Sequence, residues 1–287
     1  MINLYTIFFL IVRILSNPAA NVLQKKLSSN LSSSVINFYT YFVLSFFCIP
    51  FLNRYIINYS FGLAFWLYVL AAGFLCALGT VCMIKAINIG ELSVLGPINS
   101  YKSIVGLIIA WLFLKEIPSL SGLIGIILII AGSRFIFETT SSGFSFSLFK
   151  RQDIKLRFAA LILTGTEAVL LKKIILLSSV EACFILWCLS GLLWSFIIAA
   201  ILQKSFVIKE NKTFIYILLI ALCLGLMQFS TNYVFERMHV GFALALFQLS
   251  SIVTVLFGKA IFHETNIRKK LTGSVIMIMG SCLILMH

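Results

Sequence analysis

The chain has 287 residues, of which 61% are hydrophobic and only 11% are charged. Its mean hydropathy of +1.09 excludes a water-soluble fold, which could not bury that much apolar surface. At roughly 20 residues per 30 Å span, this length accommodates about ten membrane-spanning helices and leaves almost nothing for a soluble domain. We therefore expect an all-α integral membrane protein whose function lies inside the bilayer.

Apolar runs bounded by charged, Pro, Asn or Ser residues predict the individual spans. The first run carries Arg13 in its middle and lacks the basic leader and cleavage site of a signal peptide, so we expect it to be retained as a span. The polar, Ser-rich and Thr-rich stretch 138–155 is predicted to link two halves. The spans are expected near residues 4–23, 35–52, 63–85, 92–114 and 118–137, and near 156–176, 180–202, 213–235, 240–262 and 269–286.

The net charge of +13, from 22 basic and 9 acidic residues, would suggest nucleic acid or acidic partners for a soluble protein. Here most basic residues cluster between apolar runs, where membrane proteins keep the charges that set topology and contact anionic headgroups. We therefore expect membrane lipids, and no nucleic acid, as partners.

The chain offers no motif for catalysis or for a cofactor. Its seven cysteines fall inside apolar runs without a CxxC pair, and its three histidines form no metal-ligand pattern with them. Neither a Walker-type phosphate loop nor a GxSxG nucleophile motif is present. We expect no enzyme activity, no cofactor and no metal, so that energy for any transport must come from a coupling ion or an exchanged solute.

The second half repeats features of the first. A shift of 148 residues places Glu116 on Glu264, and a shift of 147 places Lys25 and Lys26 on Lys172 and Lys173. We therefore predict a five-helix repeat over 1–137, the linker over 138–155 and a second five-helix repeat over 156–287. Because five is odd, the second copy must enter the membrane from the opposite side. Such inverted repeats are typical of transporters that alternate access to a site near the midplane.

The ends of the fourth and ninth predicted spans carry the best local marks of a family. They read Leu112-Phe113-Leu114-Lys115-Glu116 before Gly125 and Gly132, and Ala260-Ile261-Phe262-His263-Glu264 before Gly273 and Gly280. These segments resemble the drug/metabolite transporter superfamily, specifically its ten-helix members built from two EamA-type repeats, although Lys115 and His263 replace a usual glycine. The resemblance implies a secondary carrier of amino acids, nucleotide sugars, phosphorylated metabolites or drugs.

The same residues also have a structural interpretation. The glycines of each pair are seven positions apart and share one helix face, so a neighbouring backbone can approach closely there. Glu116 and Glu264 stand at span ends, and we expect them to act as interfacial caps or turn anchors rather than as proton carriers.

Three ionisable residues lie near span centres: Arg13, Lys102 and Glu167. Each costs at least about 2.5 kcal/mol there, so such residues persist mainly where they face a cavity or a partner. Glu167 could neutralise Arg13 or Lys102 as a structural pair. Alternatively, all three line a central cavity with a net positive charge.

Polar residues extend this set of candidates for substrate binding. Pro97 is expected to disturb the fourth span and to bring Asn99 and Tyr101 towards Lys102. Each of the other polar residues could instead make an interhelical hydrogen bond. The remaining substrate-binding candidates are Asn17 and Asn21 on the first span, Asn232 on the eighth and Gln248 on the ninth.

The sequence thus predicts a secondary transporter that moves a small polar or anionic metabolite, an amino acid or a phosphorylated or sugar-type solute, by alternating access. We expect it in the cell (inner) membrane, as a monomer or homodimer. The alternative is a flippase, or a flippase subunit, for a lipid-linked amphipathic substrate, which should show a polar groove open laterally to lipid.

Two arguments predict opposite orientations. Most basic residues fall in connections after odd-numbered spans, so the positive-inside rule places both termini outside the cytoplasm. The family resemblance implies that both termini are cytoplasmic.

Overall fold

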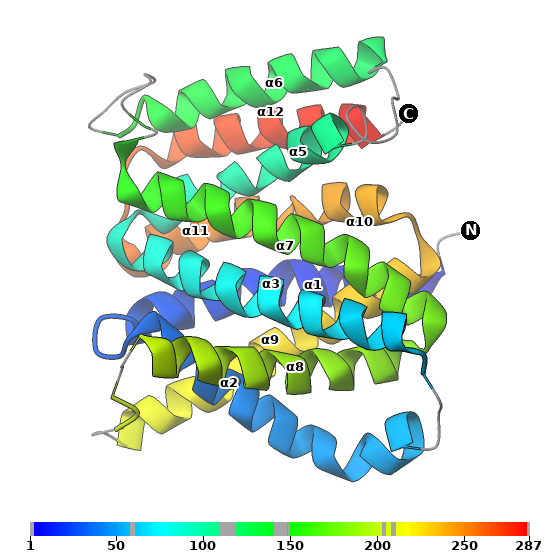
Figure 1. The fold of residues 1–287 in the computed structure, drawn as a ribbon. Coiled ribbons are helices and arrows are strands. Elements are labelled where there is room, and N and C mark those ends of the chain that lie inside the picture. Colours follow the sequence, from blue (N-terminus) through cyan, green and yellow to red (C-terminus); the bar gives the residue numbers. More distant parts are fainter. Residues whose placement is uncertain are drawn as a thin grey trace.

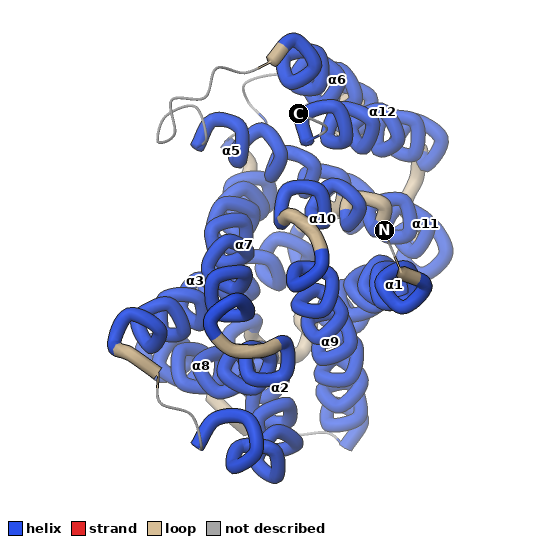
Figure 2. Tube along the Cα trace, turned by 90° about the vertical axis from the view of Figure 1, so that its right-hand side faces the viewer, coloured by secondary structure: helices blue, strands red, loops and turns tan. Residues whose placement is uncertain are grey.

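The computed structural model describes residues 3–57, 61–109, 119–140, 148, 150–202, 205–207 and 211–285. The first family segment, Leu112 to Glu116, lies outside these residues. Figure 2 shows only helices and loops in the part of the chain that is described. The first half contains α1 (Leu4–Leu27), α2 (Ser33–Cys48) with the short helices η1 (Ile49–Phe51) and η2 (Asn53–Ile57), α3 (Leu63–Ile89), α4 (Leu92–Leu95), η3 (Pro97–Ser100), α5 (Tyr101–Ile109) and α6 (Leu120–Phe137). The second half contains α7 (Gln152–Leu177), α8 (Val180–Ile201), α9 (Asn211–Arg237), α10 (Val240–Phe247), α11 (Ser250–Phe262) and α12 (Ile267–Leu285).

The helices run side by side across one bundle, and both termini lie at the same end of it (Figure 1). The two halves interlock: α3 packs along α7 and α1 along α9, while α2 packs on α8 and α6 on α12. A first helix thus pairs with the third helix of the other half in both directions, as a two-fold axis between inverted repeats requires. The predicted fold of two inverted five-helix repeats is confirmed.

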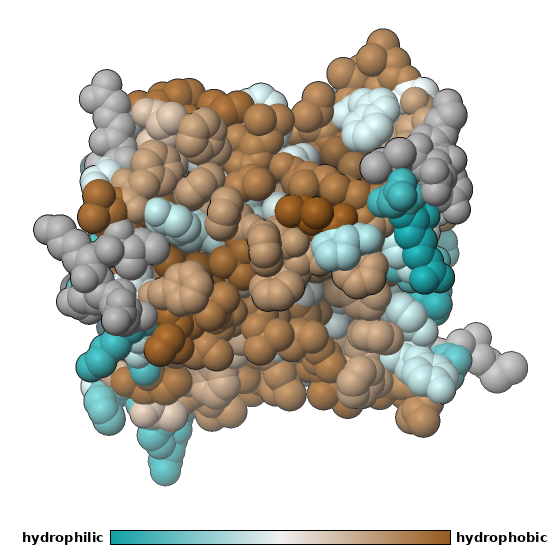
Figure 3. Space-filling view, turned by 90° about the horizontal axis from the view of Figure 1, so that it is seen from below, coloured by the Kyte–Doolittle hydropathy of each residue, from teal (hydrophilic) through white to brown (hydrophobic). Residues whose placement is uncertain are grey.

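The outer surface fits a bilayer. Among the described residues, seven spans are long and apolar enough to cross a membrane. Large apolar side chains such as Leu63, Leu120 and Ile201 are more than 70% exposed, as they would be against lipid tails. In Figure 3 apolar side chains cover the middle of the visible face, and hydrophilic side chains gather towards its two sides.

The fourth and ninth spans are both broken. Pro97 lacks an N–H group, and the backbone N–H of Asn99 donates to Gly96 at 3.1 Å in a tighter turn between α4 and α5. The irregularity expected at Pro97 is therefore present. The ninth span breaks between α10 and α11 without a proline, where the N–H of Gln248 donates to Ala245 at 3.0 Å. Corresponding spans of the two repeats are thus discontinuous at corresponding places.

The fifth helix of each half packs against the other through glycines. A Cβ added to Gly125 would lie 2.6 Å from the carbonyl oxygen of Gly280, and one added to Gly132 would lie 2.7 Å from that of Gly273. The close approach expected at these pairs is confirmed, and its partner is the matching pair in the other repeat. The pairing of 125 with 280 and of 132 with 273 makes α6 and α12 antiparallel.

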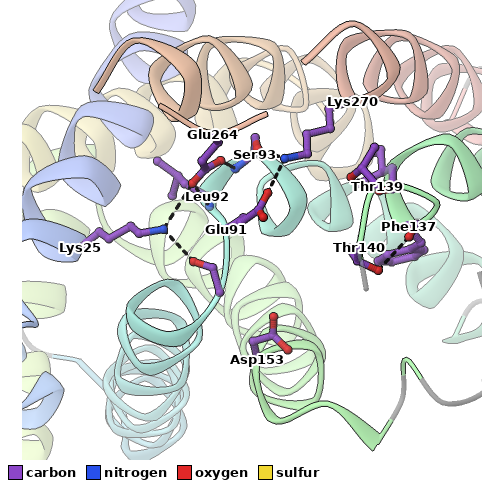
Figure 4. Close-up of polar contacts among 12 residues, drawn as sticks. Lys25, Glu91, Leu92, Ser93, Phe137, Thr139, Thr140, Asp153, Glu264 and Lys270 are labelled. Atoms are coloured by element: carbon purple, nitrogen blue, oxygen red, sulfur yellow. Dashed lines mark hydrogen bonds and ion pairs between the residues drawn. The ribbon is translucent and has the colours of Figure 1, made fainter. Parts of the chain in front are cut away.

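A polar cluster ties the two halves together at the end of the bundle opposite the termini (Figure 4). Glu264 accepts hydrogen bonds from the backbone N–H groups of Leu92 and Ser93, both at 2.8 Å, and from Nζ of Lys25 at 3.3 Å. Glu264 therefore caps the N-terminus of α4 across the interface between the halves, which confirms its expected role as a cap. Beside it, Lys270 donates to Ser93 Oγ at 2.8 Å and pairs with the carboxylate of Glu91.

Candidate functional site

A cavity of about 150 Å³ lies between the two halves of the bundle. Both broken spans reach it, the fourth through Gly96, Asn99 and Lys102 and the ninth through residues such as Phe247 and Ser250. Helices α1, α3, α7 and α9 supply the longer walls. Five of the seven predicted substrate-binding residues line it: Arg13, Asn17, Asn21, Lys102 and Glu167.

The other two candidates lie one hydrogen bond behind this lining. Asn232 is fully buried, and its Oδ1 accepts from Nε2 of Gln228, a lining residue, at 2.9 Å. Gln248 is also fully buried, and its Oε1 accepts from Nδ2 of Asn99 at 3.1 Å. The last of these bonds joins the broken fourth span to the broken ninth span. Asn232 and Gln248 therefore orient lining amides from behind the wall.

Arg13 has an incompletely satisfied guanidinium. Its central carbon lies 4.3 Å from the centre of the Phe247 ring, a cation–π arrangement that fixes the plane of the group. Nε and Nη1 are buried and have no hydrogen-bond partner among the described residues. A buried donor without an acceptor is costly, so the group is suited to an anionic ligand.

Lys102 and Glu167 line the same cavity without forming an ion pair. Lys102 stands in the first turn of α5, directly after the break. Glu167 is 5% exposed and accepts a hydrogen bond from the indole Nε1 of Trp187 at 3.0 Å. No Lys or Arg nitrogen of a described residue lies within 4.0 Å of its carboxylate. In this conformation the geometry favours the cavity-lining interpretation of Glu167 over the structural pair.

Sequence reasoning missed a third cation of the lining, Arg157. It stands at the start of the sixth predicted span and was counted with the connection charges, but α7 already begins at Gln152, and Arg157 is only 6% exposed. Its Nε donates to the carbonyl oxygen of Leu95 at 2.8 Å, beside the break in the fourth span, and its Nη1 lies 2.9 Å from Sδ of Met83. The available signal was its place inside the predicted sixth span, 156–176, because a basic residue there needs a partner or a cavity unless it reaches the interface.

The lining therefore holds three basic side chains and one acidic side chain, a formal net charge of +2. Next to them, Cys76 Sγ lies 3.2 Å from the Trp187 indole nitrogen and 3.0 Å from the Tyr41 hydroxyl, which completes a small polar wall around Glu167. Apolar side chains, such as Leu171 and Phe247, cover much of the remainder. The site is thus an anion-attracting cavity with apolar walls.

Comparisons with known proteins place this geometry in a family. The EamA-like transporter family matches the chain over residues 4–138 and again over 154–286. A solved crystal structure, titled only as that of a protein, aligns with a TM-score of 0.68 over 97% of this chain and 96% of its own, at 12% sequence identity, which shows a shared fold. None of the curated proteins compared with the chain matches it. The family is one of transporters and not of enzymes, and because its two matches span nearly the whole sequence, the chain belongs to the EamA-like transporter family.

Proposed function

We propose that the chain is a secondary carrier for a small anionic solute, which binds in the central cavity and crosses the cell (inner) membrane by alternating access. The observation that carries this proposal is the guanidinium of Arg13, whose buried Nε and Nη1 have no acceptor among the described residues. A carboxylate or phosphate group would supply acceptors of matching geometry.

The charges around Arg13 support an anion rather than a neutral solute. Lys102 and Arg157 add two further cations to the lining, against the single carboxylate of Glu167. In the low dielectric of a membrane protein's interior, an uncompensated positive charge favours entry of a counter-ion.

The broken spans add a weaker positive potential to the cavity, which also favours an anion. Helix α5 begins at Tyr101, so Lys102 lies in its first turn, and α11 begins at Ser250. Lys102 and Ser250 both line the cavity. The N-terminal ends of helices carry partial positive charge, and discontinuous helices of transporters present such ends to anionic groups.

The lining also favours a soluble ligand over a lipid-linked one. A flippase groove would expose its polar residues laterally to lipid, whereas Glu167 and Arg157 are 5% and 6% exposed. Asn17 and Asn21 offer neutral hydrogen bonds beside the cations. This combination suits a compact metabolite with one anionic end and further polar groups.

The test is ligand binding followed by transport in proteoliposomes. Purified protein is heated with succinate, glutamate, inorganic phosphate or glucose 6-phosphate, and with the uncharged analogues succinamide and glucose. A ligand present at about 100 times its Kd stabilises the folded state by about 2.7 kcal/mol, so at least one anion should raise Tm clearly while the uncharged analogues do not.

The variants Arg13→Gln and Lys102→Gln should lose this stabilisation and the corresponding uptake. Arg134→Gln is the matched control, because the Arg134 side chain is 68% exposed at a helix end and forms a surface pair with Glu138. Stabilisation by the uncharged analogues alone, or unchanged anion uptake in both cavity variants, would overturn the proposal.

A further inference from the structure

We propose that the carboxylate of Glu167 is a proton-binding site that couples proton movement to anion transport, with one proton carried on Glu167 alongside each bound anion. This inference rests on the proposed function, because it concerns the same cavity. It adds the coupling ion and the residue that carries it.

The position of Glu167 meets the first requirement of a coupling site, which is access from the cavity within a buried setting. The residue lies mid-way along α7 and lines the cavity, although it is only 5% exposed. Its donor, the Trp187 indole, is neutral, so the hydrogen bond at 3.0 Å does not compensate the charge of an ionised carboxylate. Intramembrane carboxylates in such settings mark proton pathways in pumps and transporters.

The titratable groups around Glu167 come from four helices, α2, α3, α5 and α8. Cys76 of α3 and Tyr41 of α2 contact each other beside it at 3.0 Å, and Cys183 of α8 contacts α7 one turn further on, with its Sγ 3.9 Å from the carbonyl oxygen of Leu171. The cation that acts on it is Lys102 of α5, across the cavity rather than within ion-pair distance. Protonation of Glu167 therefore changes the field at the cation that a substrate anion would use.

This arrangement makes proton and anion binding cooperative. While ionised, Glu167 serves Lys102 as an internal counter-anion and competes with the substrate. A proton taken from water onto a carboxylate oxygen removes that competition and raises the formal charge of the lining from +2 to +3. By linkage, the bound anion raises the affinity of Glu167 for its proton by the same factor as the proton raises the affinity for the anion.

Transport then follows from the same cooperativity. The halves change access with both ligands bound, the anion leaves on the other side, and Glu167 returns its proton to water there. The ionised carboxylate again balances part of the cation charge, so the empty cavity can reset. A proton gradient thereby drives anion movement in the same direction.

The first experiment needs no substrate. Infrared difference spectra of the reconstituted protein are recorded between about pH 5 and pH 9, with ¹³C-labelled glutamate to identify carboxyl bands. A protonated carboxyl band should disappear as pH rises in the wild type and in Glu138→Gln, and should be absent throughout in Glu167→Gln. Glu138 is a suitable control because its side chain is 35% exposed at the end of α6. A Glu167 carboxyl that stays ionised, or stays protonated, over this range overturns the proposal.

The second experiment measures linkage with succinate and inorganic phosphate as probe anions. In the wild type, anion affinity should fall by about tenfold for each pH unit above the titration of Glu167, and binding should take up close to one proton. In Glu167→Gln, which keeps an acceptor for Trp187, anion affinity should no longer depend on pH. That variant should lose accumulation driven by a pH gradient.

The outcomes separate this inference from the proposed function. Anion binding that is independent of pH in the wild type, or gradient-driven accumulation that survives in Glu167→Gln, overturns the coupling but leaves the carrier in place. If Glu167→Gln also loses binding and exchange while Glu167→Asp keeps them, the carboxylate contacts the substrate itself, and the coupling role is refuted. A carboxyl band that titrates but responds to neither probe anion refutes the cooperativity.

Discussion

Replacement of Glu264 by Gln should weaken the contact between the two halves. The carboxylate accepts two backbone N–H bonds at the start of α4 and one bond from Lys25, and its side chain is only 6% exposed. Glu264→Gln keeps one acceptor oxygen but removes the charge. Charge-assisted bonds exceed neutral ones by about 1 kcal/mol each, and a charge at a partly buried helix end contributes up to about 2 kcal/mol. We expect a loss of about 2 kcal/mol in the free energy of unfolding, measured by denaturant titration in mixed micelles and by Tm.

The pH dependence of this loss has a definite sign. Burial alone would raise the pKa of Glu264, but the hydrogen bonds from Ser93 and Leu92 and the charge of Lys25 outweigh it, so its pKa lies below the ordinary value. A lowered pKa in the folded state adds stability above the unfolded pKa, and this stability is lost as pH falls through the lowered value. The difference in Tm between wild type and Glu264→Gln should therefore be constant near neutral pH and shrink in acid.

A matched control separates this effect from the loss of any surface charge. Glu138→Gln removes an i,i+4 pair with Arg134 whose members are 35% and 68% exposed, and such surface pairs contribute less than about 1 kcal/mol. If Glu138→Gln destabilises as much as Glu264→Gln, or if the Glu264→Gln difference grows in acid, the capping argument is wrong.

Two further predictions concern packing and the broken span. Gly132→Ala places a Cβ 2.7 Å from the carbonyl oxygen of Gly273 and should cost about 1 to 3 kcal/mol of unfolding free energy. Gly165→Ala, whose Cβ meets nothing within 4 Å, should be neutral or stabilising. Equal Tm values for the two variants would refute the contact. Arg157→Lys keeps the cavity charge but loses the two guanidinium contacts to Leu95 and Met83. It should therefore lower Tm by the equivalent of about 1 to 3 kcal/mol while anion binding persists. A lost response to anions with an unchanged Tm would show that Arg157 serves the ligand rather than the broken span.

Much of the fold could be predicted because its causes are local in the sequence. Span number follows from the length of apolar runs, and close packing of α6 and α12 against some neighbour follows from glycines seven residues apart, although the identity of that neighbour did not. Arg13, Lys102 and Glu167 stood out because an ionisable side chain mid-span is costly without a cavity. Each of the three indeed lines the cavity.

The missed features depend on contacts between distant segments. The ninth span breaks without Pro or Gly, and Gln248 there bonds both Leu244 of its own helix and Asn99 of the other half. Arg157 was counted among the connection charges because it stands at the very start of the predicted span 156–176, while the carbonyl of Leu95 that it satisfies belongs to another span. Lys25 and Lys270, also counted among connection charges, are largely buried in the cluster around Glu264 and Glu91.

That cluster bears directly on how such a protein changes access. The duplicated lysines Lys25 and Lys172 both donate to carbonyls at the end of the third helix of their own half, Gly90 for Lys25 and Phe235 for Lys172. At the end opposite the termini, Glu264 and Lys270 extend this tie across the halves. Opening there breaks several charge-assisted bonds, each with a net contribution of about 1.5 to 3 kcal/mol and each replaced by water. A ligand that binds one conformation 100-fold more tightly than the other supplies about 2.7 kcal/mol. A bound anion therefore offsets only one or two of these bonds, so the tie favours the conformation in which this end is closed.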